Sequence, residues 1–413
     1  MNAKKLRGRV DEIIHDPMLL EVSRQKDTAF TRKRSMGFED ALCFQLDMGK
    51  TTIQSRLNRF YRHVKGGDPI SQPAFTKLRA QYDHTPFEVI VRTLVHDEYS
   101  GEYELPLWRG FQLLAVDGSY LQLPTTLELT REFGVRGGGG RPSAGISVLY
   151  DVLHSWVLDA CITHTDMNER VECAKHIDFL AGELPQVAQR SLLLLDRGYP
   201  SYDLLQKCNE NGLKFVCRCS AQSFKEVVEA HMGDSVVTIK NGQQLRVVKF
   251  LLNSGELETL ATNLFDLPED EFPALYTLRW GVETLYHRLK REVCVEKFSG
   301  KTANSIRQDF WTSMALLNMV AVFQKEADEA VLERQKALPV KRHSRARNSD
   351  LIISLRDRFI FATLCGQPEQ ADLAMDGIFK ELARAISPVR PDRHFPRTHK
   401  PYAAANSQLK SCL

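Results

Sequence analysis

Two aspartates stand at positions where divalent metal ions could be bound. Asp117 follows the largely apolar run 111–116, in the sequence Val-Asp-Gly-Ser, and Asp196 follows the apolar run 191–195, in the sequence Leu-Asp-Arg-Gly-Tyr. Both runs predict strands, so each aspartate should come directly after a strand. Active sites in open α/β sheets lie at the carboxyl ends of strands, and Mg²⁺ prefers oxygen ligands. Taken alone, however, an aspartate after a strand is more often a turn or helix-cap residue.

A third carboxylate, Glu283, lies in a segment that is expected to form one long helix from about 271 to 293. At about 100° per residue, four side chains fall within a stripe about 60° wide: Tyr276, Arg279, Glu283 and Lys290. The apolar residues fall on a separate face, and they are Leu278, Val282, Leu285, Leu289 and Val293. The pattern therefore predicts that the polar stripe points away from the core. An ordinary surface pair of Arg279 with Glu283 is the alternative, but it leaves the other two polar residues unexplained.

These residues resemble the signature of DDE transposases of the bacterial insertion-sequence-four family. That signature is Tyr, two residues, Arg, three residues, Glu, six residues and Lys, and residues 276–290 match it without a gap. The family's first two catalytic aspartates stand in contexts like those of Asp117 and Asp196, and a β-rich insertion separates the second aspartate from the glutamate. The resemblance covers about 108–335 and implies an α/β, ribonuclease-H-like fold with helical regions before and after it.

The resemblance also implies an activity and a set of functional residues. The chain would be an insertion-sequence transposase that binds terminal inverted repeats of double-stranded DNA, cleaves phosphodiester bonds and transfers strands into target DNA. Asp117, Asp196 and Glu283 would be the catalytic residues and would hold two Mg²⁺ ions, with Mn²⁺ as the alternative ion. DNA contacts are expected from Tyr276, Arg279, Lys290, Arg197 and Trp280. For Trp280, a place in the core is the more frequent role of such a side chain.

The order of the expected helices and strands divides the chain into three regions. Residues 1–105 are expected to form a helical DNA-binding region, with a helix-turn-helix-like unit at 71–96. Residues 106–335 are expected to form the catalytic domain, with a central strand at 191–195 and a β-rich insertion at about 220–265. Residues 336–413 are expected to form a helical region with a basic linker at 339–349 and a disordered tail from Pro388. Helices beyond 340 are the predicted contact of a homodimer.

Composition excludes several other classes of protein. Hydrophobic residues make up 43% and charged residues 26% of the 413 residues, which is typical of a globular protein, and a net charge of +3 indicates no particular partner. The nine cysteines form no CxxC pair, which favours buried free thiols over a zinc site. No long apolar stretch is present, so neither secretion nor a membrane partner is expected, and the predicted location is the bacterial cytoplasm, at the nucleoid.

A nucleotide cofactor is not expected either. The triplet Gly-Lys-Thr occurs at 49–51 and 300–302, but Phe44 and Val295 stand where a phosphate-binding loop requires glycine. Two alternatives to a transposase remain at this point. One is a nuclease of the same fold that does not transfer strands. The other is a domesticated, catalytically silent DNA-binding protein, which predicts the loss of a carboxylate, whereas all three candidates are present.

Overall fold

In the computed structural model, the chain divides into two units that are discontinuous in sequence. The structure describes residues 1–336 except 33, 48, 50, 102–104, 138–139 and 253, together with 344–346, 351–352, 355, 368–382, 384 and 386–388. Unit 1 comprises Met1–Leu94, Leu123–Leu129 and Leu289–Leu413, and unit 2 comprises Val95–Gln122 and Thr130–Arg288. Unit 1 thus draws on both chain ends. The boundaries predicted near 105 and 335 stay predictions about separately folding domains.

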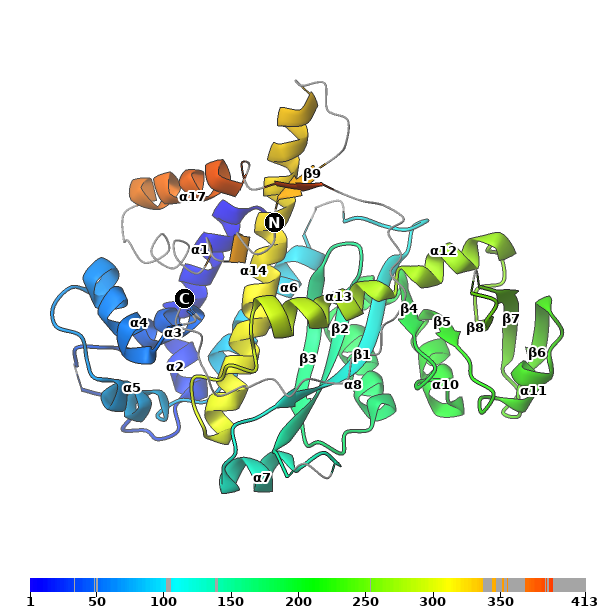
Figure 1. Cartoon of the computed structure of the whole chain (residues 1–413), viewed down its shortest axis with the longest axis horizontal. Helices are drawn as coiled ribbons and strands as arrows, with labels where there is room; N and C mark the ends of the chain where they lie inside the picture. Colours follow the sequence, from blue (N-terminus) through cyan, green and yellow to red (C-terminus); the bar gives the residue numbers. More distant parts are fainter. Residues whose placement is uncertain are drawn as a thin grey trace. The chain divides into compact units, whose positions relative to one another are not determined.

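Unit 2 is built on one eight-stranded mixed sheet (Figure 1). Its strands are β1 (Gln112–Gln122), β2 (Ser143–Asp151), β3 (Trp156–Thr163), β4 (Ser191–Leu195), β5 (Lys214–Arg218), β6 (Gly233–Thr238), β7 (Gln244–Leu251) and β8 (Leu257–Thr262). They lie in the order β3-β2-β1-β4-β5-β8-β7-β6. The neighbours β1, β4 and β5 run parallel to one another, and all other pairs are antiparallel.

The centre of the sheet and its helices agree with the sequence pattern. All five residues of β4 are buried, as expected for an apolar strand with a neighbour on each side. Helix α8 (Glu169–Glu183) packs on β1, β2 and β3, and α10 (Tyr202–Glu210) packs on α8 and β5. The hairpin expected around 151–155 connects β2 to β3. Short helices α9 (Pro185–Ala188) and α11 (Lys225–Glu229) lie in the connections before β4 and β6.

A buried polar chain fixes α8 to the sheet. His176 of α8 lies 3.0 Å from the Ser147 hydroxyl of β2 through Nε2 and 2.7 Å from the Asp159 carboxylate of β3 through Nδ1. All three side chains are buried. Because these buried polar groups would lose their hydrogen bonds if the helix moved, the chain through His176 fixes how α8 lies on the sheet.

The predicted β-rich insertion is present and extends the main sheet instead of forming a separate one. β8 pairs antiparallel with β5, and β7 and β6 follow outward. Asn263, just after β8, accepts a hydrogen bond from Phe215 N at 2.9 Å and donates one to Leu213 O at 2.9 Å. These bonds join β8 to the strand beside it, and three strands lie within the segment 220–265 for which a β-rich insertion was predicted.

The single long helix predicted from 271 to 293 is wrong. The segment is instead four short pieces: the 3₁₀-helix η3 (Glu269–Glu271), α12 (Phe272–Thr277), α13 (Trp280–His287) and the π-helix η4 (Arg288–Glu292). Between α12 and α13 the backbone bonds span three residues, as in Arg279 N to Tyr276 O and Val282 N to Arg279 O, both 3.1 Å. Gly281 favours this tightening because glycine is a poor helix former, and a side chain there would meet Val152 at 3.1 Å.

Unit 1 is helical. It contains α1 (Ala3–Ile14), α2 (Pro17–Ser23), α3 (Phe38–Leu46), α4 (Ile53–Phe60), the π-helix η1 (Tyr61–Lys65), α5 (Gln72–Arg79), α14 (Ala303–Lys336) and α17 (Pro368–Leu382), with a small ladder of β9 (Ser344–Ala346) and β10 (Ile386–Pro388). Helices α6 (Thr85–Tyr99) and α7 (Leu127–Phe133) continue from unit 1 into unit 2. Ser71 caps α5, because its hydroxyl accepts a hydrogen bond from Ala74 N.

Helix α14 is the centre of unit 1. It packs on α1, α3 and α17, and most of its residues up to Phe323 are buried. Arg79 at the end of α5 forms a buried ion pair with Asp309 of α14 at 2.8 Å and also bonds to Gln308 at 2.6 Å. Apolar packing and this buried ion pair together hold α14 in unit 1. The basic linker at 339–349, apart from 344–346, and the tail beyond Pro388 lie outside the described residues.

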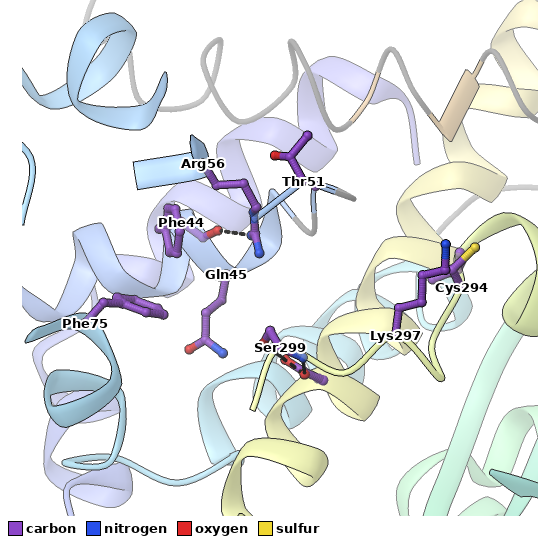
Figure 2. A pocket seen from close by; sticks show the side chains of 11 residues that line it. Phe44, Gln45, Thr51, Arg56, Phe75, Cys294, Lys297 and Ser299 are labelled. Carbon is purple, nitrogen blue, oxygen red and sulfur yellow. Dashed lines mark hydrogen bonds between the residues drawn. The ribbon is translucent and has the colours of Figure 1, made fainter. Parts of the chain in front are cut away.

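A small cavity of about 40 Å³ lies inside unit 1 (Figure 2). Its lining includes Gly49 and Thr51 of the first Gly-Lys-Thr triplet, and Arg56, which donates to Phe44 O at 2.9 Å. Pockets for small molecules are about 300–1,000 Å³, so this space suits packing or a single water but no nucleotide.

Two further sequence expectations can be compared with the described part of the chain. The seven cysteines there are free, and five of them are buried, as predicted. None of the helices described combines the length and the apolar character needed to cross a bilayer.

Candidate active site

The two aspartates lie side by side on neighbouring strands. The parallel ladder between β1 and β4 ends at the pair Ala115 and Leu194, an offset of 79 residues. The same offset of 79 separates Asp117 from Asp196, so both aspartates lie two residues beyond the last pair of the ladder. Strand pairing thus brings the two carboxylates to one edge, as the sequence predicted.

The position of Asp117 within its strand differs from the prediction. Asp196 does follow β4 directly, but β1 continues through Asp117 to Gln122, and Asp117 pairs with Val148 of β2. β1 continues past Asp117 because β2 supplies a pairing partner there, where β4 no longer does. Asp117 is therefore held by a regular antiparallel ladder, which fixes its backbone more firmly than a turn would.

Arg279 lies between Glu283 and Asp196 and interacts with both carboxylates. The Arg279 guanidinium Nη2 lies 2.8 Å from Glu283 Oε1 and 3.9 Å from Asp196 Oδ2. The Arg279 side chain is 5% exposed, and its Nε has no hydrogen-bond partner in the described part of the chain. The cation therefore lies between two of the three acidic groups and offsets part of their charge.

The prediction that the polar stripe points away from the core is wrong for two of its residues. Tyr276 and Arg279 are both buried, whereas the predicted apolar residue Leu278 is half-exposed. The angle of 100° per residue fails here because the three-residue bonds between α12 and α13 rotate one helix relative to the other. The buried side of this segment packs on the sheet, since α13 contacts β1 (Figure 1).

Two tyrosines fix the backbone at the two aspartates. The Tyr276 hydroxyl donates to Leu195 O at 3.3 Å, one residue before Asp196, and the Tyr286 hydroxyl donates to Asp117 O at 2.6 Å. Burial raises the pKa of both hydroxyls, so both stay protonated donors at neutral pH. Tyr286 was not among the residues predicted from the sequence. The one feature of the sequence that could have indicated Tyr286 is its position next to Leu285, on the buried side of α13.

A fourth carboxylate, Glu169, was also missed. It is the first residue of α8, and its carboxylate lies against both glycines that follow the aspartates. A side chain added at Gly118 would meet Glu169 Oε1 at 2.7 Å, and one added at Gly198 would meet Oε2 at 3.3 Å. An acidic residue in the first turn of a helix is common, because it interacts favourably with the helix dipole, so the sequence alone did not single it out.

The electrostatics show an excess of negative charge at this edge. Burial raises the pKa of Asp117 from 3.8 to about 7; Arg279 and the Gly118 N–H lower it, while Glu169 and Asp196 raise it further. Burial also raises the pKa of Glu169, with Asp196 adding to the effect and Arg136 opposing it. Arg279 alone does not neutralise the group, so a further cation would stabilise the ionised carboxylates.

The donor set suits a divalent metal ion by its chemistry. It consists of carboxylate oxygens, the ligands preferred by Mg²⁺ and Mn²⁺. As the described residues are placed, however, no group of three or more His, Cys, Asp or Glu side chains is close enough to hold a metal ion. Glu283 is paired with Arg279 instead.

The remaining predicted residues occupy different settings. Arg197 is exposed, and its backbone N–H donates to Asp196 Oδ1 at 2.7 Å. Trp280 is 46% exposed, so the interpretation of Trp280 as a core residue is wrong. Lys290 is half-buried and lies in η4, in the part of the chain assigned to unit 1. Arg197 and Trp280 are thus the predicted DNA contacts whose side chains already reach the surface of unit 2.

Comparison with known proteins agrees with this fold. A family model described as "Transposase DDE domain" matches residues 108–319, just over half of the chain. Two curated relatives are from Escherichia coli (strain K12). "Transposase InsG for insertion sequence element IS4" is 26% identical over 239 residues, covering 52% of each chain. "Putative transposase InsZ" is 24% identical over 164 residues, covering 39% of this chain and 54% of the relative. The chain thus spans about half the length of these relatives.

A solved structure extends the comparison to the fold. The cryo-EM structure of the piggyBac transposase synaptic complex with hairpin DNA superposes with a TM-score of 0.51 over 90% of this chain and 84% of that chain, at 13% identity. This likeness supports the ribonuclease-H-like fold expected from the sequence. The resemblance to insertion-sequence-four transposases is confirmed by the curated relatives. The chain belongs to the family of the transposase DDE domain.

Proposed function

We propose that this chain is a DNA transposase that cleaves and joins phosphodiester bonds at Asp117, Asp196 and Glu283. The observation that supports this most directly is the shared register of the two aspartates at one sheet edge, with Glu283 joined to Asp196 through Arg279. A transposase needs its acidic groups on rigid elements, because a displacement of about 1 Å can cost a hundredfold in rate. Two strands and one helix supply that rigidity.

Two chemical steps follow from this site. In cleavage, a water oxygen attacks phosphorus, the bond to the 3′ oxygen breaks, and that oxygen leaves as a 3′ hydroxyl after taking up a proton. In strand transfer, this hydroxyl attacks a phosphorus of target DNA, one phosphodiester bond forms and one breaks, and no external energy source is needed. Bound Mg²⁺ or Mn²⁺ would stabilise the charge on the attacking and leaving oxygens in both steps.

The protein's own groups would have distinct tasks in these steps. Asp117, Asp196 and Glu283 would hold the metal ions, while Tyr286 and Tyr276 keep the strand backbones in place. Burial raises the pKa of Asp117 to about 7, so a proton carried by this carboxyl would be lost when a metal ion binds. Arg279, released from Glu283, would then be available to bind a DNA phosphate with its two-pronged guanidinium.

The DNA contacts differ in the change each would require. Arg197 and Trp280 are exposed near the carboxylates and would reach DNA directly. Arg279 and Tyr276 would first have to give up their bonds to Glu283 and to Leu195 O. Lys290 completes the proposed set as a phosphate contact. Phosphate contacts of this kind position the DNA and make binding sensitive to salt.

We assign recognition of the terminal repeats to α5 and α6, within residues 71–96. On α5 the side that includes Lys77 is exposed, whereas Arg79 is committed to Asp309. The helices beyond 340 are the proposed contact of a homodimer that holds two DNA ends. A footprint on the transposon ends that survives deletion of residues 1–100 would refute the first assignment, and an unchanged dimer mass after truncation near 340 would refute the second.

The decisive experiment is Mg²⁺-dependent cleavage of a labelled duplex that carries the terminal repeat. The wild-type protein should cut it, and Glu283→Ala should cut at least about a hundredfold more slowly, the upper end of what outer-shell partners of a metal contribute. Glu269→Ala is the matched control, because Glu269 is an exposed acid of the same segment. Cleavage without joined products would indicate a nuclease. Binding without cleavage would indicate a silent DNA-binding protein. If Glu283→Ala cleaves as fast as the wild type, the third carboxylate is a different residue.

A further inference from the structure

We propose that the guanidinium of Arg136, stacked on the ring of Tyr120, binds a phosphate of the DNA strand that is cut. The proposal rests on the proposed function, because it takes DNA as the ligand of the acidic edge. It adds a contact to the five predicted from the sequence, all of which come after Asp196 in the chain. Arg136 instead lies in the connection between β1 and β2.

An aromatic ring holds the Arg136 side chain in place. The guanidinium carbon lies 3.6 Å from the centre of the Tyr120 ring, well inside the about 6 Å that is typical of a cation–π contact. Arg136 is exposed, and it forms no hydrogen bond and no ion pair with another residue that the structure describes. Stacking on a ring orders an arginine but leaves its N–H groups available, and their fork matches the oxygens of a phosphate.

Tyr120 lies on the strand that carries Asp117, three residues further along β1, where it pairs with Gly145 of β2. At about 3.4 Å per residue, this step along the strand is about 10 Å. Successive phosphates of one DNA strand advance by about 3.4 Å along the helix axis. A DNA strand whose scissile phosphate lies at Asp117 would therefore present to Arg136 a phosphate about three nucleotides away.

The ends of the segment that carries Arg136 are fixed by backbone pairing. Val135 and Pro142 form an antiparallel bridge, and Ser143 N donates to Gly134 O at 3.1 Å. Arg136 directly follows the bridged residue Val135, so the point at which its backbone leaves β1 and β2 is set by these bonds. Part of the entropy that an exposed arginine loses when it binds a ligand is thus lost already on folding.

The nearest acid leaves the N–H groups of Arg136 available. Strand alternation places Tyr120 on the same side of β1 as Gly118, where an added Cβ would meet Glu169 Oε1 at 2.7 Å. Burial raises the pKa of the Glu169 carboxyl and Asp196 adds to this, whereas Arg136 opposes it, although no ion pair joins Arg136 to Glu169. An acidic edge repels DNA phosphates, and a stacked cation beside it offsets part of that repulsion.

The test is binding of a fluorescent duplex that carries the terminal repeat to the full-length protein, measured by anisotropy with a chelator at several salt concentrations. Arg136→Ala should lower the slope of log affinity against log salt by about 0.9, the contribution of one phosphate. The ratio of wild-type to variant affinity should then grow about three- to fourfold when salt is lowered from about 200 to about 50 mM. Lys214→Ala is the matched control and should keep the wild-type slope, because Lys214 is an exposed cation at the start of β5, the opposite edge of the sheet.

Variants of Tyr120 distinguish a platform for Arg136 from a purely structural ring. Tyr120→Phe keeps the ring and should bind the duplex like the wild type. Tyr120→Leu should weaken binding, but it should cause no further loss when it is combined with Arg136→Ala, because the two side chains act as one unit. Equal losses from Tyr120→Leu with and without Arg136 would show that the ring acts through the fold of β1, and would overturn its role as a platform.

Substitution of single phosphates by neutral methylphosphonates locates the contact. The wild type should lose affinity at one position about three nucleotides from the cut, and Arg136→Ala should be insensitive there. An unchanged affinity and salt slope in Arg136→Ala, with a wild type that cuts the duplex, would overturn the proposal and leave the proposed function intact. A wild type that binds through Arg136 but never cuts would support the phosphate contact and contradict the proposed cleavage. Absence of binding by the wild type would overturn both.

Discussion

Binding of a divalent metal ion should release a proton from Asp117. Burial, together with Glu169 and Asp196, raises the pKa of this carboxyl to about 7. The metal ion binds the ionised carboxylate, so any proton on Asp117 must leave when the ion enters. The number of protons released therefore reports the protonation of Asp117 in the metal-free protein.

The expected magnitude follows from the pKa. With a pKa of about 7, Asp117 should be mostly protonated at pH 6 and mostly ionised at pH 8, so the number of protons released per protein should fall across this range. Below pH 7 the apparent affinity for the metal should fall by up to about tenfold per pH unit, because protons compete for the same oxygens.

Titration calorimetry with Mn²⁺ measures this release directly. At each pH the titration is repeated in two buffers of different ionisation enthalpy, and the difference in heat gives the number of protons transferred to the buffer. Asp117→Asn provides the control, because its amide has no proton to lose in this range and keeps an oxygen for the Gly118 N–H.

Two results would contradict proton release from Asp117. Metal binding by the wild type at pH 6 and pH 7 without proton release would mean that Asp117 is already ionised before the ion enters. The same release from Asp117→Asn as from the wild type would mean that another group, for example Glu169, is the one that carries the proton.

Two further predictions concern the metal-free protein and its tyrosines. The folded-state pKa of Asp117 is above the usual 3.8, so the folded state binds more protons between about pH 4 and pH 7. The free energy of unfolding of the metal-free protein should therefore fall as pH rises through this window, by about 4 kcal/mol at pH 8, at about 1.4 kcal/mol per pH unit. In urea unfolding with a chelator, Asp117→Asn should recover most of that lost free energy. Equal free energies of unfolding for the two proteins at pH 8 would contradict this prediction. Tyr286→Phe removes the 2.6 Å bond to Asp117 O, and should cost about 1–2 kcal/mol and slow cleavage, whereas Tyr276→Phe removes a bond of 3.3 Å and should cost less. If Tyr286→Phe cuts the terminal-repeat duplex at the wild-type rate, the bond does not position Asp117.

Most of the sheet could be predicted because its strands carry their signal locally. An unbroken apolar run such as 191–195 has few alternatives to a central strand, and the hairpin around 151–155 joins two such runs. The aspartates could be found for the same reason, since each stands at a fixed point relative to its strand. The end of β1 could not be predicted in this way, because the continuation of the strand past Asp117 depends on its pairing with β2.

The environment of the third carboxylate was harder to predict. The spacing of Tyr276, Arg279 and Glu283 identified the segment, but a regular helix was assumed, and the shift to three-residue bonds near Gly281 depends on close packing against Val152. Glu169 had no signal at all beyond that of an ordinary helix start. Its proximity to Asp117 and Asp196 arises from tertiary packing of α8, which a single sequence does not specify.

The strands β6, β7 and β8 explain how 87 residues can separate Asp196 from Glu283 in sequence. They add to the outer side of β5, so the order β1, β4 and β5 at the acidic edge does not depend on their number or length. The hairpin tip at Asn241 and Gly242 is the turn that connects β6 to β7, the two outermost strands. A fluorescent or affinity module grafted at that tip would lengthen the chain between Asp196 and Glu283 without altering the strand order β1, β4 and β5.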